Sequence, residues 1–146
     1  MSEAIVAGEA GVEVRDGPHH VSAMMLESIA ECAHAMATAP GVEGLVEGQG
    51  VRLVLDPDLP SGIDGLATDT TIYVRPRGGA AYVAILILHE LAHILLARAG
   101  LPDTHGDVWM LALALAAPRP VLARLRGAGV VTPVGLAAAV GMPWWA

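Results

Sequence analysis

Two histidines and a glutamate in one short run carry the clearest chemistry of this sequence. The run His89-Glu90-Leu91-Ala92-His93 places two imidazoles four residues apart, and on a helix such residues lie one above the other on the same face. Both rings can then bind one cation, while Glu90, turned about 100° round the helix, can reach a water held by the metal. We predict one Zn2+ per chain, with His89 and His93 as ligands and Glu90 as general base.

A catalytic zinc ion usually has a third protein ligand, and the candidates follow soon after the motif. Asp103, His105 and Asp107 lie close together in the sequence. A turn at 100–102 would let the chain double back, and the next helix is expected to start near His105. We therefore expect His105 to be the third ligand. Asp107 is the alternative, either as a ligand or as a hydrogen-bond partner of a ligand histidine.

The helix that must hold the motif is predicted over about residues 80–99. Nearly all of its residues are apolar, Gly100 can take the left-handed conformation that ends a helix, and Pro102 blocks continuation. The run approaches the length of a membrane span. However, its two histidines and its glutamate are costly in lipid, and no second apolar run of that length follows. We predict the buried central helix of a soluble domain.

The rest of the chain predicts an α+β domain, with strands before the motif and helices after it. Apolar residues at three- and four-residue steps predict a helix over about 20–37 capped by Ser22. An alternating pattern predicts strands at 51–55, 66–67 and 71–74, the last two forming a hairpin. The strand ending at Val74 is expected to be an edge to which an extended peptide pairs. Further helices are predicted over about 106–117, 120–126 and 132–140.

Composition bounds the class of protein. The 146 residues suffice for one domain, which we divide into an irregular arm (1–18), the core, and a helical C-terminal segment (119–146). A net charge of −7 disfavours nucleic acid as a partner. Cys32 is the single cysteine, is expected to be a small buried residue, and fits a reducing cytoplasm. The first residues lack the pattern of a signal peptide.

Several stretches resemble the ImmA/IrrE-type metallopeptidases, which are compact gluzincin-like zinc peptidases of bacteria and their phages. The likeness covers about residues 50–145 and rests on the runs Thr71–Val74, Ile87–Leu96, Val108–Pro118 and Leu136–Pro143. It implies a minimal zincin-like domain in which a small sheet packs on the motif helix. It also implies limited proteolysis of a protein partner, often a transcriptional repressor.

The sequence departs from that family at the third ligand. The family usually has a glutamate at the start of its Ala-rich helix, a position that falls on His105 here. His105-Gly106 followed by Trp109 also resembles the SprT-like proteases, in which a third histidine precedes a glycine. We therefore expect a zinc endopeptidase acting on a protein or peptide, with neither nucleic acid nor a membrane as partner. The alternative is a metal-binding module that recognises a regulatory partner without cutting it.

Overall fold

The computed structural model of this chain describes residues 5–6, 21–117, 124 and 127–129. It contains both helices and a small sheet, which confirms the α+β class. In chain order the described elements are β1 (Ile5–Val6), α1 (Ala23–Ala35), α2 (Val42–Gly48), β2 (Arg52–Leu55), β3 (Gly65–Ala67), β4 (Thr71–Val74), α3 (Ala80–Arg98) and α4 (His105–Ala116).

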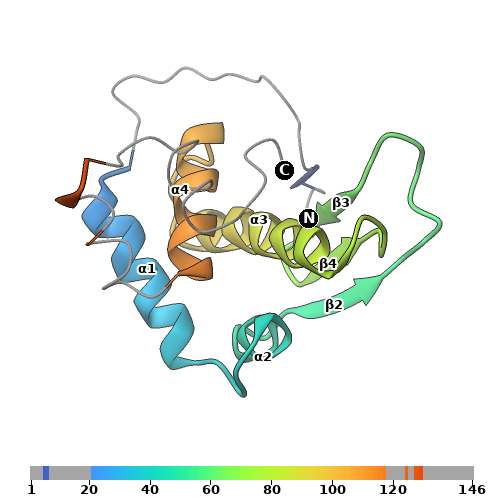
Figure 1. Cartoon of the computed structure of the whole chain (residues 1–146), viewed down its shortest axis with the longest axis horizontal. Helices are drawn as coiled ribbons and strands as arrows, with labels where there is room; N and C mark the ends of the chain where they lie inside the picture. Colours follow the sequence, from blue (N-terminus) through green and yellow to red (C-terminus); the bar gives the residue numbers. More distant parts are fainter. Residues whose placement is uncertain (1–4, 7–20, 118–123, 125–126, 130–146) are drawn as a thin grey trace.

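Helix α3 forms the middle layer of the fold (Figure 1). It packs on β3 and β4 on one side and on α4 on the other, and α1 in turn covers α4. Every residue of α3 from Ile85 to Leu96 is buried. A helix that is apolar on all sides must be enclosed in this way, so the prediction of a buried central helix is confirmed.

Helix α3 would also pass as a membrane span by its length and apolar composition, and no other described helix does. In this fold 67% of its most apolar stretch is buried by the rest of the chain. The central helix of a protein core meets the same two criteria, so the property is weak evidence of a membrane.

The sheet has the order β1-β3-β4-β2. β3 is antiparallel to β4, as the predicted hairpin requires, while β4 is parallel to β2. The strand that ends at Val74 is thus paired on both sides, and the prediction that it is an open edge is wrong. A parallel pairing across a long connection leaves no local pattern in the sequence. On the other side of the hairpin, Ile5 and Val6 pair with β3.

The helix ends follow the local signals in the sequence. Ser22 caps α1, its Oγ accepting a hydrogen bond from the N–H of Met25 at 3.1 Å. After α3, Gly100 has a φ of 71°, the left-handed conformation in which glycine ends a helix. Thr104 caps α4 through the N–H of Asp107. The predicted helices 20–37, 80–99 and 106–117 are therefore confirmed, with small shifts of their bounds.

Helix α2 was not predicted, because its sequence is rich in glycine, which disfavours helices. Its packing explains the glycines. A Cβ on Gly44 would collide with the backbone of Ala39, and one on Gly48 with the backbone of Met36. The close approach of α2 to the segment after α1 therefore depends on two residues without side chains, and tertiary packing outweighs helix propensity here.

Other predictions for the outer parts of the chain have mixed outcomes. Cys32 is exposed and not buried, because the buried face of α1 is made by Leu26, Ala30 and Ala33. The arm over 1–18, the C-terminal segment and its predicted helices over 120–126 and 132–140 fall outside the described residues, apart from residues 5–6, 124 and 127–129.

Candidate metal centre

Helix α3 brings two of the predicted ligands side by side. The ring centroids of His89 and His93 are 5.0 Å apart, with the ring planes at 78°. Both residues are buried, with exposed fractions of 3% and 8%. This is the arrangement that the four-residue spacing predicts on one helix face.

His89 has a buried nitrogen atom without a hydrogen-bond partner in the described part of the chain, its Nδ1. Burial, followed by the nearby imidazoles of His93 and His105, lowers the pKa of His89 to about 3. The ring is therefore neutral at pH 7, which is the form that can bind a metal. A buried polar atom without a partner is costly, and a bound cation would remove that cost.

His93 is held by a carboxylate from the segment between α3 and α4. Its Nδ1 lies 3.0 Å from Oδ2 of Asp103. In zinc proteins such a carboxylate fixes the orientation of the ring and directs its other nitrogen at the metal. The sequence alone predicts Asp103 only as a candidate ligand. The structure makes it the partner of His93, because the turn after Gly100 leads the chain back along α3.

Glu90 points toward the sheet and is fully buried, at 0% exposure. It lies against the first residue of β3, where a Cβ built on Gly65 would be 3.2 Å from Oε2 of Glu90. His89, the preceding residue, contacts Trp109 of α4, with ring centroids 4.7 Å apart. The motif therefore presents its imidazoles and its carboxylate to different neighbours, as the 100° step between successive helix residues requires.

His105 is the first residue of α4, and its side chain is exposed. Its ring centroid is 6.3 Å from that of Trp109, so Trp109 contacts both His105 and His89. Across residues 21–117, no three His, Cys, Asp or Glu side chains are grouped closely enough to hold a metal ion. The structure thus brings His89 and His93 together but does not bring His105 into one group with them.

Asp107, the alternative ligand, is buried at the start of α4. Its Oδ2 accepts hydrogen bonds from the hydroxyl of Thr104 at 2.8 Å and from the N–H of Val21 at 3.1 Å. The first bond belongs to a reciprocal cap of the helix, and the second ties the start of α1 to α4. These contacts give Asp107 a structural role at this corner of the fold.

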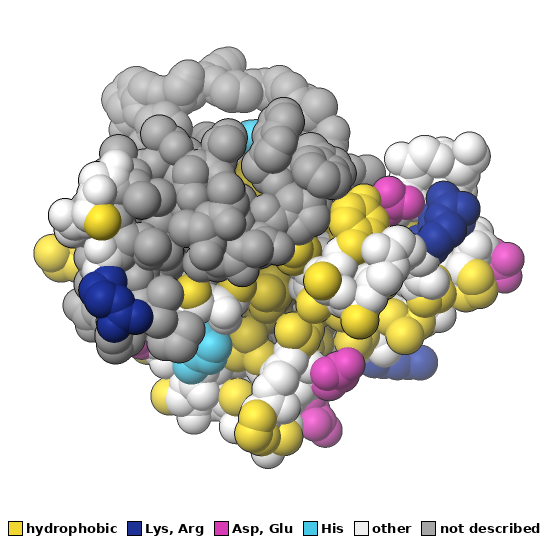
Figure 2. Space-filling view, in the orientation of Figure 1, with side chains coloured by type: hydrophobic (Ala, Val, Ile, Leu, Met, Phe, Trp, Pro, Cys, Tyr) yellow, Lys and Arg dark blue, Asp and Glu magenta, His cyan; other side chains and the backbone are white. Residues whose placement is uncertain are grey.

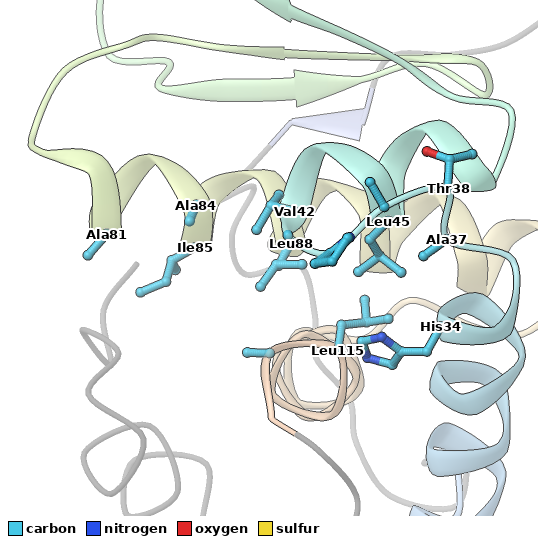
Figure 3. Close-up of a pocket in the computed structure, with 14 residues that line it drawn as sticks. His34, Ala37, Thr38, Val42, Leu45, Ala81, Ala84, Ile85, Leu88 and Leu115 are labelled. Atoms are coloured by element: carbon cyan, nitrogen blue, oxygen red, sulfur yellow. The ribbon is translucent and has the colours of Figure 1, made fainter.

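A cavity of about 750 Å3 lies on another face of α3. Figure 2 shows mostly apolar side chains across the middle of the described surface. Figure 3 shows apolar side chains of α2, α3 and α4 lining the cavity, with His34 of α1 at its edge. Among the residues that the structure describes, its lining contains no carboxylate and none of His89, Glu90 and His93. The cavity is therefore separate from the candidate metal centre.

The described residues fit the two-histidine half of a zinc site. A neutral, buried imidazole, whose Nδ1 has no partner among the described residues, lies beside a second imidazole that a carboxylate orients. Within the same described ranges, no third ligand is grouped with the two rings. The fold and the site together define an α+β domain with a paired-histidine motif on its central helix.

Comparisons with known proteins do not extend this description. No protein-family model matches the chain, and searches of curated proteins and of solved structures give no significant match. The likeness to zinc peptidases, which rests on the residues of the sequence, therefore stays a hypothesis.

Proposed function

We propose that this chain is a cytoplasmic zinc-dependent endopeptidase that makes limited cuts in a protein partner. The observation that supports it best is the pair of buried imidazoles on α3, one with an unpartnered nitrogen among the described residues and one held by Asp103. His89 and His93 would hold the ion, and His105 is our candidate for the third ligand. When bound, zinc would polarise the scissile carbonyl and lower the pKa of a bound water.

Glu90 would be the general base of this reaction. Its carboxylate would take a proton from the attacking water and pass it to the leaving amine. Asp103 would act indirectly, by fixing the ring of His93. His89, Glu90 and His93 come from α3, and Asp103 comes from the turn that follows it. His105 would come from the start of α4.

The sheet offers a place for an extended substrate. β3 is the strand that lies against Glu90, and its outer side pairs with Ile5 and Val6 in this structure. A peptide that adds to a sheet uses its own backbone hydrogen bonds. A substrate strand that pairs with β3 would therefore take the place of residues 5–6.

Metal removal tests the proposal directly. The parent chain, stripped of metal with a chelator, should cleave no peptide, and adding about one equivalent of Zn2+ should restore cleavage. A library of unstructured peptides, read by mass spectrometry, provides the assay. Cleavage that persists in excess chelator would contradict a zinc-dependent mechanism.

Asp103 gives a second test, through the affinity for zinc. Asp103→Ala should raise the Kd for Zn2+ by about 10- to 100-fold, because the ring of His93 loses the carboxylate that orients it. The matched control is Asp69→Ala, which removes the same charge from an exposed position before β4. Calorimetric titration of the metal-free proteins gives both values. Equal affinities in the two variants would show that Asp103 does not support the site.

A non-cleaving metal-binding module is the second candidate function. The observation that favours it is that no third ligand is grouped with His89 and His93 in the described part of the chain. Such a module would bind zinc or another divalent cation and recognise a regulatory partner. Zinc binding with no cleavage of any peptide in the library would support the module over the enzyme.

A further inference from the structure

Gly65 lies at a close approach of β3 to the motif helix. A Cβ added to it would be 3.2 Å from Oε2 and 3.4 Å from Cγ of Glu90. The distance to Oε2 is shorter than most Cβ contacts in proteins, and the distance to Cγ is at the short end of ordinary contact. The glutamate is also fully buried. Gly65 is not among the glycines with positive φ, so the backbone does not require glycine there. A methyl there would fit only if Glu90 gave way by a few tenths of an ångström.

The neighbouring positions of the hairpin show that this gap is local. Ala67, two residues along β3 on the same face, is fully buried, and so are Ile72 and Val74 of β4. Val74 pairs directly with Gly65. Glycine weakens a strand and often marks a site of close approach. Here it leaves a recess in an otherwise filled face, and the side chain of Glu90 lies in that recess.

The strand itself is firmly anchored at this point. Asp64, the residue before Gly65, accepts hydrogen bonds from Nε of Arg75 at 3.3 Å and from the hydroxyl of Tyr82 at 3.1 Å. The guanidinium of Arg75 also donates to four backbone carbonyls of the loop before β3, those of Pro57, Leu59, Pro60 and Ile63. This loop is therefore tied to the end of β4 and to the first turn of α3.

Because β3 is anchored, a methyl group added at position 65 would move the side chain of Glu90 and not the strand. Because Asp64 holds the start of β3 through two side chains, the end of the glutamate moves more readily than the backbone. A side chain at position 65 would therefore displace the carboxylate of Glu90 by a few tenths of an ångström.

We propose that Gly65 is a positioning residue for Glu90: the recess that it leaves in β3 sets the place of the carboxylate beside the paired histidines. The catalytic consequence rests on the proposed function, in which Glu90 is the base. The contact itself does not, since it can be measured in the metal-free chain.

A double-mutant cycle on stability tests the contact. Gly65→Ala is compared in the parent and in the Glu90→Ala background, where the recess is empty. In the parent it should lower the urea midpoint, because the methyl crowds the buried glutamate and forces it to shift. In the Glu90→Ala background it should leave the midpoint unchanged or raise it, because the methyl fills a void. An equal decrease in both backgrounds would overturn the proposal.

Kinetics test the positioning. Gly65→Ala should lower kcat for peptide cleavage by about tenfold, as small misplacements of catalytic groups do, with little change in KM or in zinc content. The matched control is Ala67→Gly, which changes the same strand face by one methyl group and should keep kcat. A Gly65→Ala variant with the kcat of the parent would overturn the positioning role. If the parent itself cleaves nothing, the proposed function fails, while the urea cycle still decides the contact.

Discussion

Replacing Glu90 with Gln should lower kcat for peptide cleavage by about 10²- to 10⁴-fold, the usual contribution of a general base, while one Zn2+ per chain stays bound. Gln has nearly the size of Glu, so it can occupy the recess beside Gly65 without a clash. Its amide cannot take a proton from water. The measurements are steady-state cleavage of the best library peptide and the metal content of the same sample.

The control for this variant is Glu43→Gln. Glu43 is exposed in the first turn of α2, so its replacement removes the same charge at a distance from the motif and should leave kcat unchanged. A Glu90→Gln protein that cleaves as fast as the parent would refute the mechanism. A variant that has lost zinc as well would show that Glu90 supports the metal site and would leave its role as base without support.

Replacing His89 with Ala should abolish zinc binding at concentrations that saturate the parent. The variant loses one of the two imidazoles that the described part of the chain places side by side, and a lone His93 cannot form a tight site. In the parent, zinc at about 100 times its Kd should stabilise the fold by about 2.7 kcal/mol, which is on the order of 5–10 °C in Tm for a domain of this size. In His89→Ala, added zinc should leave Tm unchanged.

His34→Ala is the matched control for that loss. His34 is exposed near the end of α1, at the edge of the apolar cavity (Figure 3), and takes no part in the paired-histidine site. Its variant should bind zinc and gain stability from it as the parent does. Calorimetry and thermal unfolding with and without zinc measure both effects. An unchanged Kd for Zn2+ in His89→Ala would show that the metal does not bind at His89 on α3.

The parts of the fold that local signals specify could be predicted from the sequence. The structure confirms the helix ends predicted from Ser22 and Gly100. It also confirms the helix predicted from the apolar run before Gly100. The pairing of β2 with β4 could not be predicted, because it joins segments separated in the chain by a loop and by β3. Helix α2 was missed because its formation depends on packing at Gly44 that has no counterpart in helix propensity.

The candidate site likewise has one part that the sequence predicts and another that only the structure reveals. The proximity of His89 and His93 follows from helix geometry alone, so their spacing was sufficient to predict it. The contact of Asp103 with His93 depends on the path of the turn after α3. The contact of Gly65 with Glu90 depends on how the sheet packs on α3. Residues that position a site through tertiary contacts leave no periodic pattern, so only the structure reveals them.

The most direct measurement is an anomalous difference map at the zinc edge from crystals of the zinc-loaded chain. We expect one strong peak about 2.0–2.1 Å from a ring nitrogen of both His89 and His93, and this map would also identify the third ligand. A map with no peak between these two rings, or with the rings turned away from each other in zinc-saturated protein, would contradict this expectation.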